Sequence, residues 1–111
     1  MRKSGAEILL RVRNLSVCRA FYRDVLALGA PATDSSFLCR FALAPDTFLT
    51  LVPIAESETV ANAPWIFRPG DPELVRDNLN AYGYRIREIE TAGRFAQEVL
   101  DPEQNPVHLM E

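Results

Sequence analysis

The only histidine of the 111-residue chain, His108, lies close to its C-terminal end. It follows the turn-forming sequence DPEQN at residues 101–105, in a stretch where apolar and polar residues alternate. This period of two predicts a strand that presents His108 on the face opposite Val107 and Leu109. An imidazole there could act as a general base or bind a metal ion, or it could be a half-exposed polar side chain on a cavity wall.

Four arginines lie on or beside predicted strands and could bind an anion through bidentate hydrogen bonds. They are Arg11, Arg40, Arg68 and Arg94. Arginines on edge strands are also a common protection against aggregation, so both interpretations stay open. Six aromatic residues could line a pocket, although we expect most of them in the core beneath the helices. They are Phe37, Phe41, Phe48, Trp65, Phe67 and Phe95.

The length and charge of the chain limit the number of domains and the classes of binding partner. A chain of 111 residues predicts one domain over residues 1–111 with one hydrophobic core. The formal net charge is −3, and the lysines and arginines are scattered, which argues against a nucleic-acid-binding surface. A small molecule or another protein is the expected partner.

The N-terminal region and the cysteines bear on location. The apolar run at residues 8–10 ends at Arg11, which makes it too short for a secretion signal or a membrane span. We therefore expect a cytoplasmic protein that does not enter a membrane. Cys18 and Cys39 fall on different predicted elements without paired spacing, which predicts reduced, partly buried thiols.

The same order of elements is predicted twice. In the first half, a strand over residues 6–13 precedes a helix of about 13 residues that begins after Asn14 or Ser16 and ends before Gly29. Two strands at residues 37–43 and 47–54 follow, with at most a short edge strand before them. Residues 55–62 form a connector.

In the second half, residues 65–67 form a strand and Asp71 caps a helix with Pro72 at its first position. We expect the buried side of this helix to be Leu74, Val75, Leu79 and Tyr82. Strands follow at residues 84–90, 94–100 and 106–110.

These patterns predict an α+β fold of two βαβββ units, at about residues 6–54 and 63–111. The units would form curved mixed sheets with the helices on the convex face and an open concave cup for a ligand. Ten apolar residues should lie mostly buried between sheet and helices. They are Ile8, Leu10, Val12, Phe21, Leu26, Leu49, Leu51, Leu79, Val107 and Leu109.

Two runs of sequence carry a family resemblance. Residues 12–15 read VRNL, Cys18 follows, and residues 21–26 read FYRDVL, while residues 101–109 read DPEQNPVHL. They resemble the opening motif V-x-D-L-x-x-S-x-x-F-Y-x-x-V-L-G-L and the closing motif D-P-x-G-N-x-I-E-L of the vicinal oxygen chelate superfamily. This superfamily includes glyoxalase I, bleomycin-resistance proteins and extradiol dioxygenases, and the resemblance implies the same two-unit fold.

Departures from the motifs occur at Asn14, Cys18 and Gln104, where the family has Asp, Ser and Gly. At Gln104 we expect either a non-glycine residue with positive φ, at a cost of about 1 kcal/mol, or a turn shifted by one residue.

The resemblance also implies where a metal would bind. Metal-dependent members take ligands from the first and last strand of each unit, and these positions fall on Glu7, Thr50, Pro64 and His108. Glu7 and His108 are competent ligands, whereas Thr50 is a poor one and Pro64 has no side-chain donor. The implied site is therefore incomplete.

Two functions fit these observations. The first is a homodimer of glyoxalase and bleomycin-resistance type whose cups bind a small aromatic or anionic molecule without a complete metal site. Its candidate ligand contacts are Arg11, Arg40, Thr50 and Arg68. The alternative is a divalent-metal-dependent lyase, isomerase or dioxygenase with Glu7 and His108 as ligands. These two are also the candidate catalytic residues, since a carboxylate can orient a histidine that acts as a general base, and we expect them to face each other across the cup.

Overall fold

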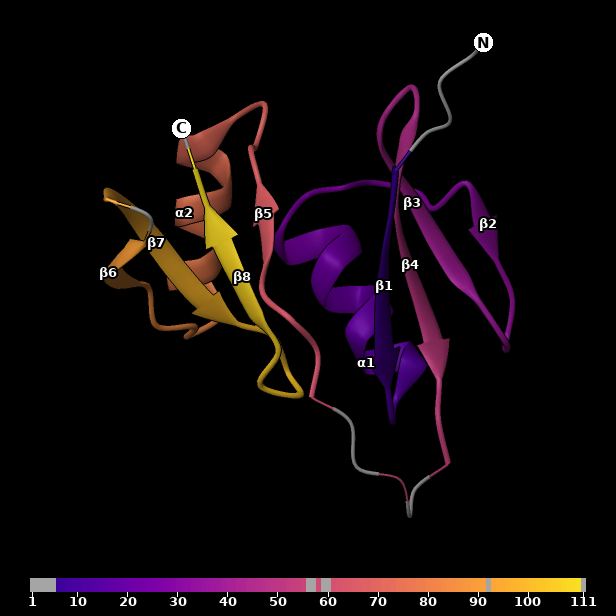
Figure 1. The fold of residues 1–111 in the computed structure, drawn as a ribbon. Coiled ribbons are helices and arrows are strands. Elements are labelled where there is room, and N and C mark those ends of the chain that lie inside the picture. Colours follow the sequence, from indigo (N-terminus) through magenta and orange to yellow (C-terminus); the bar gives the residue numbers. More distant parts are fainter. Residues whose placement is uncertain (1–5, 56–57, 59–60, 92, 111) are drawn as a thin grey trace, which may run out of the picture.

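The computed structural model describes residues 6–55, 58, 61–91 and 93–110. Two four-stranded mixed sheets lie side by side, and the helices lie behind them in Figure 1. Residues 1–5, which precede the apolar run at residues 8–10, are outside the described residues. So are residues 56, 57, 59 and 60 of the predicted connector.

The first unit follows the predicted order. Strand β1 (Ala6–Val12) leads to helix α1 (Leu15–Ala20), whose N-terminus is capped by the side chain of Asn14. The sheet has the order β1-β4-β3-β2, with β1 and β4 parallel and the other pairs antiparallel. The remaining strands are β2 (Thr33–Asp34), β3 (Cys39–Ala44) and β4 (Thr47–Pro53).

The second unit repeats this plan in the order β5-β8-β7-β6, with β5 and β8 parallel. Helix α2 (Pro72–Ala81) begins with Pro72, and the side chain of Asp71 accepts a hydrogen bond from the Leu74 amide. The strands are β5 (Trp65–Phe67), β6 (Arg87–Thr91), β7 (Arg94–Leu100) and β8 (Pro106–Leu109). The predicted α+β architecture of two βαβββ units is therefore confirmed.

The edge strands β1 and β5 are neighbours at the centre of the molecule (Figure 1). Asn62, just before β5, joins them, because its side chain accepts a hydrogen bond from the Arg11 amide and donates one to the Arg11 carbonyl. Buried residues of both units form one hydrophobic cluster beneath the two sheets. The opposite face of the sheets carries no helix.

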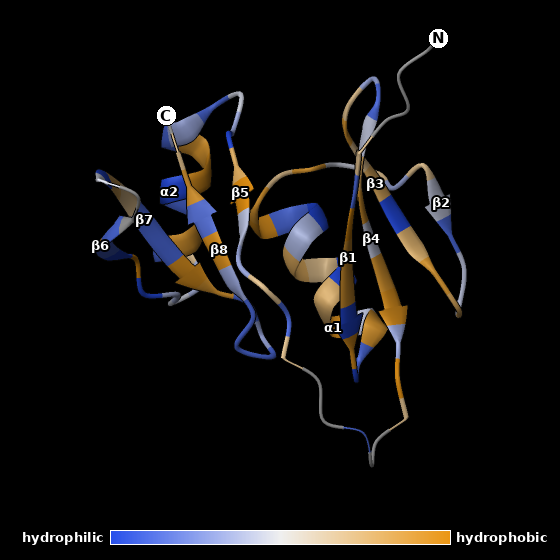
Figure 2. Cartoon of the chain, in the orientation of Figure 1, coloured by the Kyte–Doolittle hydropathy of each residue, from blue (hydrophilic) through white to orange (hydrophobic). Residues whose placement is uncertain are grey.

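Burial confirms most of the predicted core. Nine of the ten predicted residues are buried, and Ile8 is half-buried. Figure 2 shows hydrophobic and hydrophilic residues next to each other along the strands of both sheets. The buried side of α2 was predicted too broadly, because only Val75 and Leu79 are buried whereas Leu74 and Tyr82 are exposed.

The first helix differs from the single helix that was predicted. After α1 the chain continues as a π-helix at Phe21–Val25, and the Leu26 amide donates to the carbonyl of Phe21. A π-turn accommodates one extra residue per turn. It brings Phe21, Tyr22 and Val25 into the core together.

Both cysteines are free and buried, in agreement with the prediction of reduced thiols. Burial raises the pKa of each thiol, and for Cys18 the nearby carboxylates Asp101 and Glu103 raise the pKa further. Each thiol is therefore protonated and unreactive at neutral pH.

Candidate functional site

A row of polar side chains crosses the open face of the second sheet. Arg87 of β6 pairs in register with Glu98 of β7, and Glu98 pairs with His108 of β8. The next neighbour across the sheet is Ile66 of β5. All four belong to the same phase of the pleat, so their side chains lie on the face that bears no helix.

The three polar members of this row are bonded to one another. Arg87 Nη2 lies 2.5 Å from Glu98 Oε1, and His108 Nε2 lies 3.2 Å from Glu98 Oε2. Burial of Glu98 raises the pKa of its carboxyl, but the hydrogen bonds from Arg87 and His108 outweigh this and leave the pKa below its ordinary value. Glu98 is therefore an ionised carboxylate that orients both the guanidinium and the imidazole.

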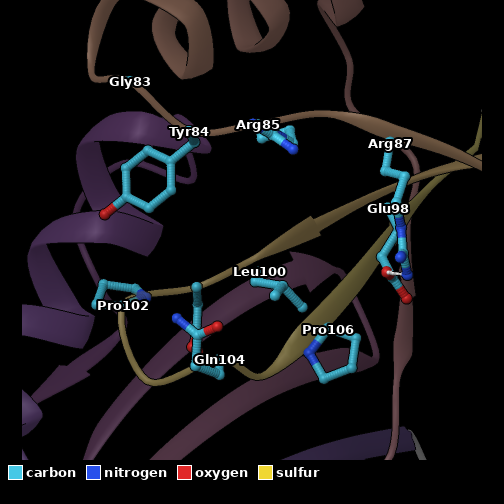
Figure 3. Close-up of a pocket in the computed structure, with 10 residues that line it drawn as sticks. Gly83, Tyr84, Arg85, Arg87, Glu98, Leu100, Pro102, Gln104 and Pro106 are labelled. Carbon is cyan, nitrogen blue, oxygen red and sulfur yellow. Dashed lines mark hydrogen bonds and ion pairs between the residues drawn. The ribbon is translucent and has the colours of Figure 1, made fainter.

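A cavity of about 720 Å³ borders this row. Figure 3 shows its two walls, the connection from α2 to β6 on one side and the β7–β8 hairpin on the other. Apolar surface comes from Tyr84, Leu100, Pro102 and Pro106, and charged groups come from arginines and Glu98. Burial raises the pKa of Tyr84, so its phenol stays neutral at ordinary pH.

Two arginines at this cavity differ in their bonding. The guanidinium of Arg87 is bonded to Glu98, as the dashed line in Figure 3 shows. Arg85 lines the same cavity and is exposed. Within the described part of the chain, the side chain of Arg85 makes no hydrogen bond or ion pair.

The turn at residues 101–105, which is the loop of the β7–β8 hairpin, lines one wall of the cavity and connects it to the first unit. The Asp101 carboxylate is 1% exposed and accepts hydrogen bonds from the Tyr22 hydroxyl at 2.7 Å and from the amides of Glu103 and Asn105. The Glu103 carboxylate accepts hydrogen bonds from the amides of Arg13 and Asn14 at 2.7 and 2.6 Å. The cavity is thereby fixed to the start of α1.

Several predicted site residues lie together on the open face of the first sheet. The Thr50 hydroxyl donates a hydrogen bond to Glu7, and Arg40 Nε lies 3.5 Å from Glu7 Oε2. The Arg40 guanidinium also lies 3.8 Å from the centroid of the Phe48 ring. This group borders a smaller cavity of about 170 Å³.

The other predicted residues are dispersed. Arg11 is exposed on β1, and Arg68 lies at a separate cavity of about 350 Å³ between the sheets. Glu7 and His108 each bond within their own sheet, and in the described part of the chain neither bonds the other. Their meeting across a cup in an assembly stays a prediction.

The donors at the implied metal positions do not fit a divalent ion. Arg40 places a guanidinium beside Glu7, and Thr50 uses its hydroxyl on the same carboxylate. Pro64 offers no donor, and His108 directs Nε2 to Glu98. Among the described residues no group of three or more His, Cys, Asp or Glu side chains could hold a metal ion.

Sequence reasoning missed Arg85, Arg87 and Glu98. The strand over residues 84–90 and the strand over 94–100 were expected, but the residues that pair across them depend on the geometry of the turns that join the strands. Glu98 has the same phase in its strand as Leu100, which follows it by two residues. Alignment of the β7–β8 hairpin about its turn would have placed Glu98 opposite His108.

Comparison with known structures identifies the fold. A scan of protein-family models and a search of curated proteins found no match. Among solved structures, lactoylglutathione lyase from Agrobacterium tumefaciens is 21% identical over 98% of this chain and 93% of its own, with a TM-score of 0.71. A glyoxalase/bleomycin resistance protein from Catenulispora acidiphila is 17% identical over 96% of each chain, with a TM-score of 0.74.

The chain has the vicinal oxygen chelate fold. A glyoxylase/bleomycin resistance protein/dioxygenase domain from a Frankia species agrees, at 12% identity over 99% of this chain and 98% of its own, with a TM-score of 0.73. At these identities the vicinal oxygen chelate fold is shared, whereas the chemistry must be inferred from the site. Within the described residues, no helix is both long enough and apolar enough to cross a membrane.

Proposed function

We propose that this vicinal oxygen chelate protein binds a small organic molecule, without a metal ion, in the cavity of its second unit. The observation that carries the proposal is the cavity itself. Its volume of about 720 Å³ lies within the range of ligand sites for drug-sized molecules, which is about 300–1,000 Å³. A mixed apolar and charged lining is also typical of such sites.

The first sheet supports a different role for the residues that the sequence indicated. Thr50 donates a hydrogen bond to Glu7, Arg40 forms an ion pair with Glu7, and the cavity beside them measures about 170 Å³, which is small for an organic ligand. We infer that they stabilise the open face and that ligand contacts come from the second sheet. His108 then acts by holding Glu98 in place at the border of the cavity.

The proposal includes a cytoplasmic homodimer. The cytoplasmic location is consistent with two free, buried thiols. Strands β2 and β6 are the outer edges of the sheets, and an unpaired edge can add a strand from another copy. Light scattering should give about twice the chain mass of 12.5 kDa at micromolar concentration. A mass near that of one chain would contradict the dimer but not the ligand site.

Ligand-observed NMR with benzamide, benzoate and benzylamine tests the binding site. At least one of these compounds should bind, and Leu100→Trp should weaken the signal because the larger side chain takes up space in the cavity that Leu100 lines. Leu9→Trp is the matched control, since Leu9 is an exposed leucine on the open face of the first sheet.

Circular dichroism should show both variants folded. Binding should also be unchanged by EDTA, since no step in the proposal needs a metal. Binding that is equal in both tryptophan variants, or that is lost in EDTA, would contradict the proposal.

A further inference from the structure

We infer that the ligand of the second-unit cavity is a small organic monoanion recognised by Arg85, and that Glu98 sets this charge preference by neutralising Arg87. This inference rests on the proposed function and specifies the chemical class of its ligand. It assigns a binding role to Arg85 and a specificity-determining role to Glu98.

Arg85 has the bonding capacity that an anion needs. Within the described residues its guanidinium has no ion-pair or hydrogen-bond partner, although it lines the cavity. A guanidinium presents two parallel N–H donors that match the oxygens of a carboxylate, and such charge-assisted pairs are stronger than neutral hydrogen bonds. The carboxylate end of a ligand would therefore lie against Arg85.

Arg87 does not offer the same capacity. Its guanidinium forms an ion pair with Glu98 at 2.5 Å, and Glu98 is also bonded to His108. The Glu98 carboxylate is 14% exposed, whereas the Arg87 side chain is 67% exposed. A second anionic group near Arg87 would therefore meet the negative charge of Glu98, which disfavours dianions.

The remaining charged group at the cavity, Asp101, leaves Arg85 available for a ligand. Asp101 is buried in the β7–β8 hairpin, and its carboxylate oxygens accept hydrogen bonds from Tyr22, Glu103 and Asn105. With Glu98 matched by Arg87, Arg85 is the cation that remains for a ligand among the described lining residues. The apolar lining from Tyr84, Leu100 and Pro106 suits a flat hydrocarbon body.

Calorimetric titration with benzoate and benzamide tests Arg85 in the intact protein. The two probes have the same ring and nearly the same size but differ in charge. Benzoate should bind about tenfold more tightly than benzamide, and Arg85→Ala should remove this difference. Arg94→Ala is the control, because Arg94 is an exposed arginine on β7 that does not line the cavity.

Glu98→Gln tests the charge preference with phthalate, a dianion. This change keeps the shape of the side chain but leaves the charge of Arg87 without a counterion, so phthalate should gain about fivefold relative to benzoate. Unchanged relative affinity would overturn the role of Glu98.

The outcomes distinguish failure of the monoanion preference from failure of ligand binding by the cavity. Equal binding of benzoate and benzamide by the intact protein, or a preference for benzoate that survives Arg85→Ala, would overturn the inference while the cavity still binds organic molecules. If no probe of any charge binds, the proposed function fails and the inference fails with it.

Discussion

The hairpins that close the two units differ in loop length and in role. Two residues separate the last cross-strand pair of the first unit, Ala44 and Thr47, whereas five separate Leu100 and Pro106 in the second. In the first loop, residues 45–46, Asp46 is exposed. In the second loop, residues 101–105, Asp101 is 1% exposed and bonds to the π-helix of the first unit through Tyr22.

The open faces of the two sheets also differ, in the bonds between their side chains and in the size of the cavity beside them. Arg40 and Thr50 occupy in the first sheet the paired positions that Glu98 and His108 occupy in the second. In the first sheet, Arg40 and Thr50 both bond Glu7 and little space remains. In the second sheet, Glu98 forms an ion pair with Arg87 of the neighbouring strand β6, and a large cavity borders Arg87 and Glu98. The same βαβββ fold therefore has bonded side chains beside a small cavity in the first unit and a large cavity in the second.

The largest expected difference between the hairpins is in stability. Asp101→Ala should lower the free energy of unfolding by about 3–5 kcal/mol, because it leaves the Tyr22 hydroxyl and two loop amides buried without an acceptor. Asp46→Ala, at the exposed loop, should change it by less than about 0.5 kcal/mol. Urea denaturation measures both. Equal small losses would show that the second loop does not hold the units together.

A smaller effect is expected from backbone conformation. Gln104 has φ of 70°, so of the two alternatives expected for this turn the structure shows the non-glycine residue with positive φ. Gln104→Gly should therefore stabilise the protein by up to about 1 kcal/mol, since glycine adopts this conformation without a Cβ penalty.

Asp46 lies in the first loop and is not among the described residues with positive φ. Asp46→Gly should be neutral or destabilising, as glycine has more freedom to lose on folding. Thermal melts of the two variants compare the loops. Stabilisation by both changes would argue against a special conformation at Gln104.

The smallest expected effect is the dependence of stability on pH through Glu98. The folded-state pKa of Glu98 is lowered, so its stabilising contribution is complete above the ordinary value of 4.5 and is lost as the pH falls through the lower folded pKa. Glu98→Gln should cost about 0.5–1 kcal/mol at pH 7, because Arg87 is largely exposed and solvent screens the pair. Denaturation at pH 7 and pH 3 should show this difference shrinking in acid. A difference that grows in acid would reverse the assigned sign.

The sequence predicted the framework because each unit repeats strong local signals. The Asn14 cap, the Asp71-Pro72 helix start and the alternation in β1 and β8 each depend on neighbouring residues alone. The π-helix was not predictable in this way, because it depends on tertiary packing of Phe21 and Tyr22 against the second unit. Tyr82 was misplaced for a related reason, since the turn after α2 leaves it in solvent.

The site was less predictable because it depends on contacts across strands. His108 was correctly expected on the face opposite Val107 and Leu109, but its partner Glu98 is set by hairpin register. Glu7 was also placed on the open face, but its bonds to Thr50 and Arg40 bring together strands 33 or more residues apart in the sequence. The cavity depends further on how the α2–β6 connection lies over the sheet.

The most direct test of the difference between the two units is to map a bound probe residue by residue. Titration of ¹⁵N-labelled protein with benzoate should shift amide signals of Tyr84, Arg85 and Gln104 at the cavity of the second unit. Signals of Glu7, Arg40 and Thr50 on the first sheet should stay unchanged. Shifts confined to the first sheet would contradict the assignment of the ligand site to the second unit.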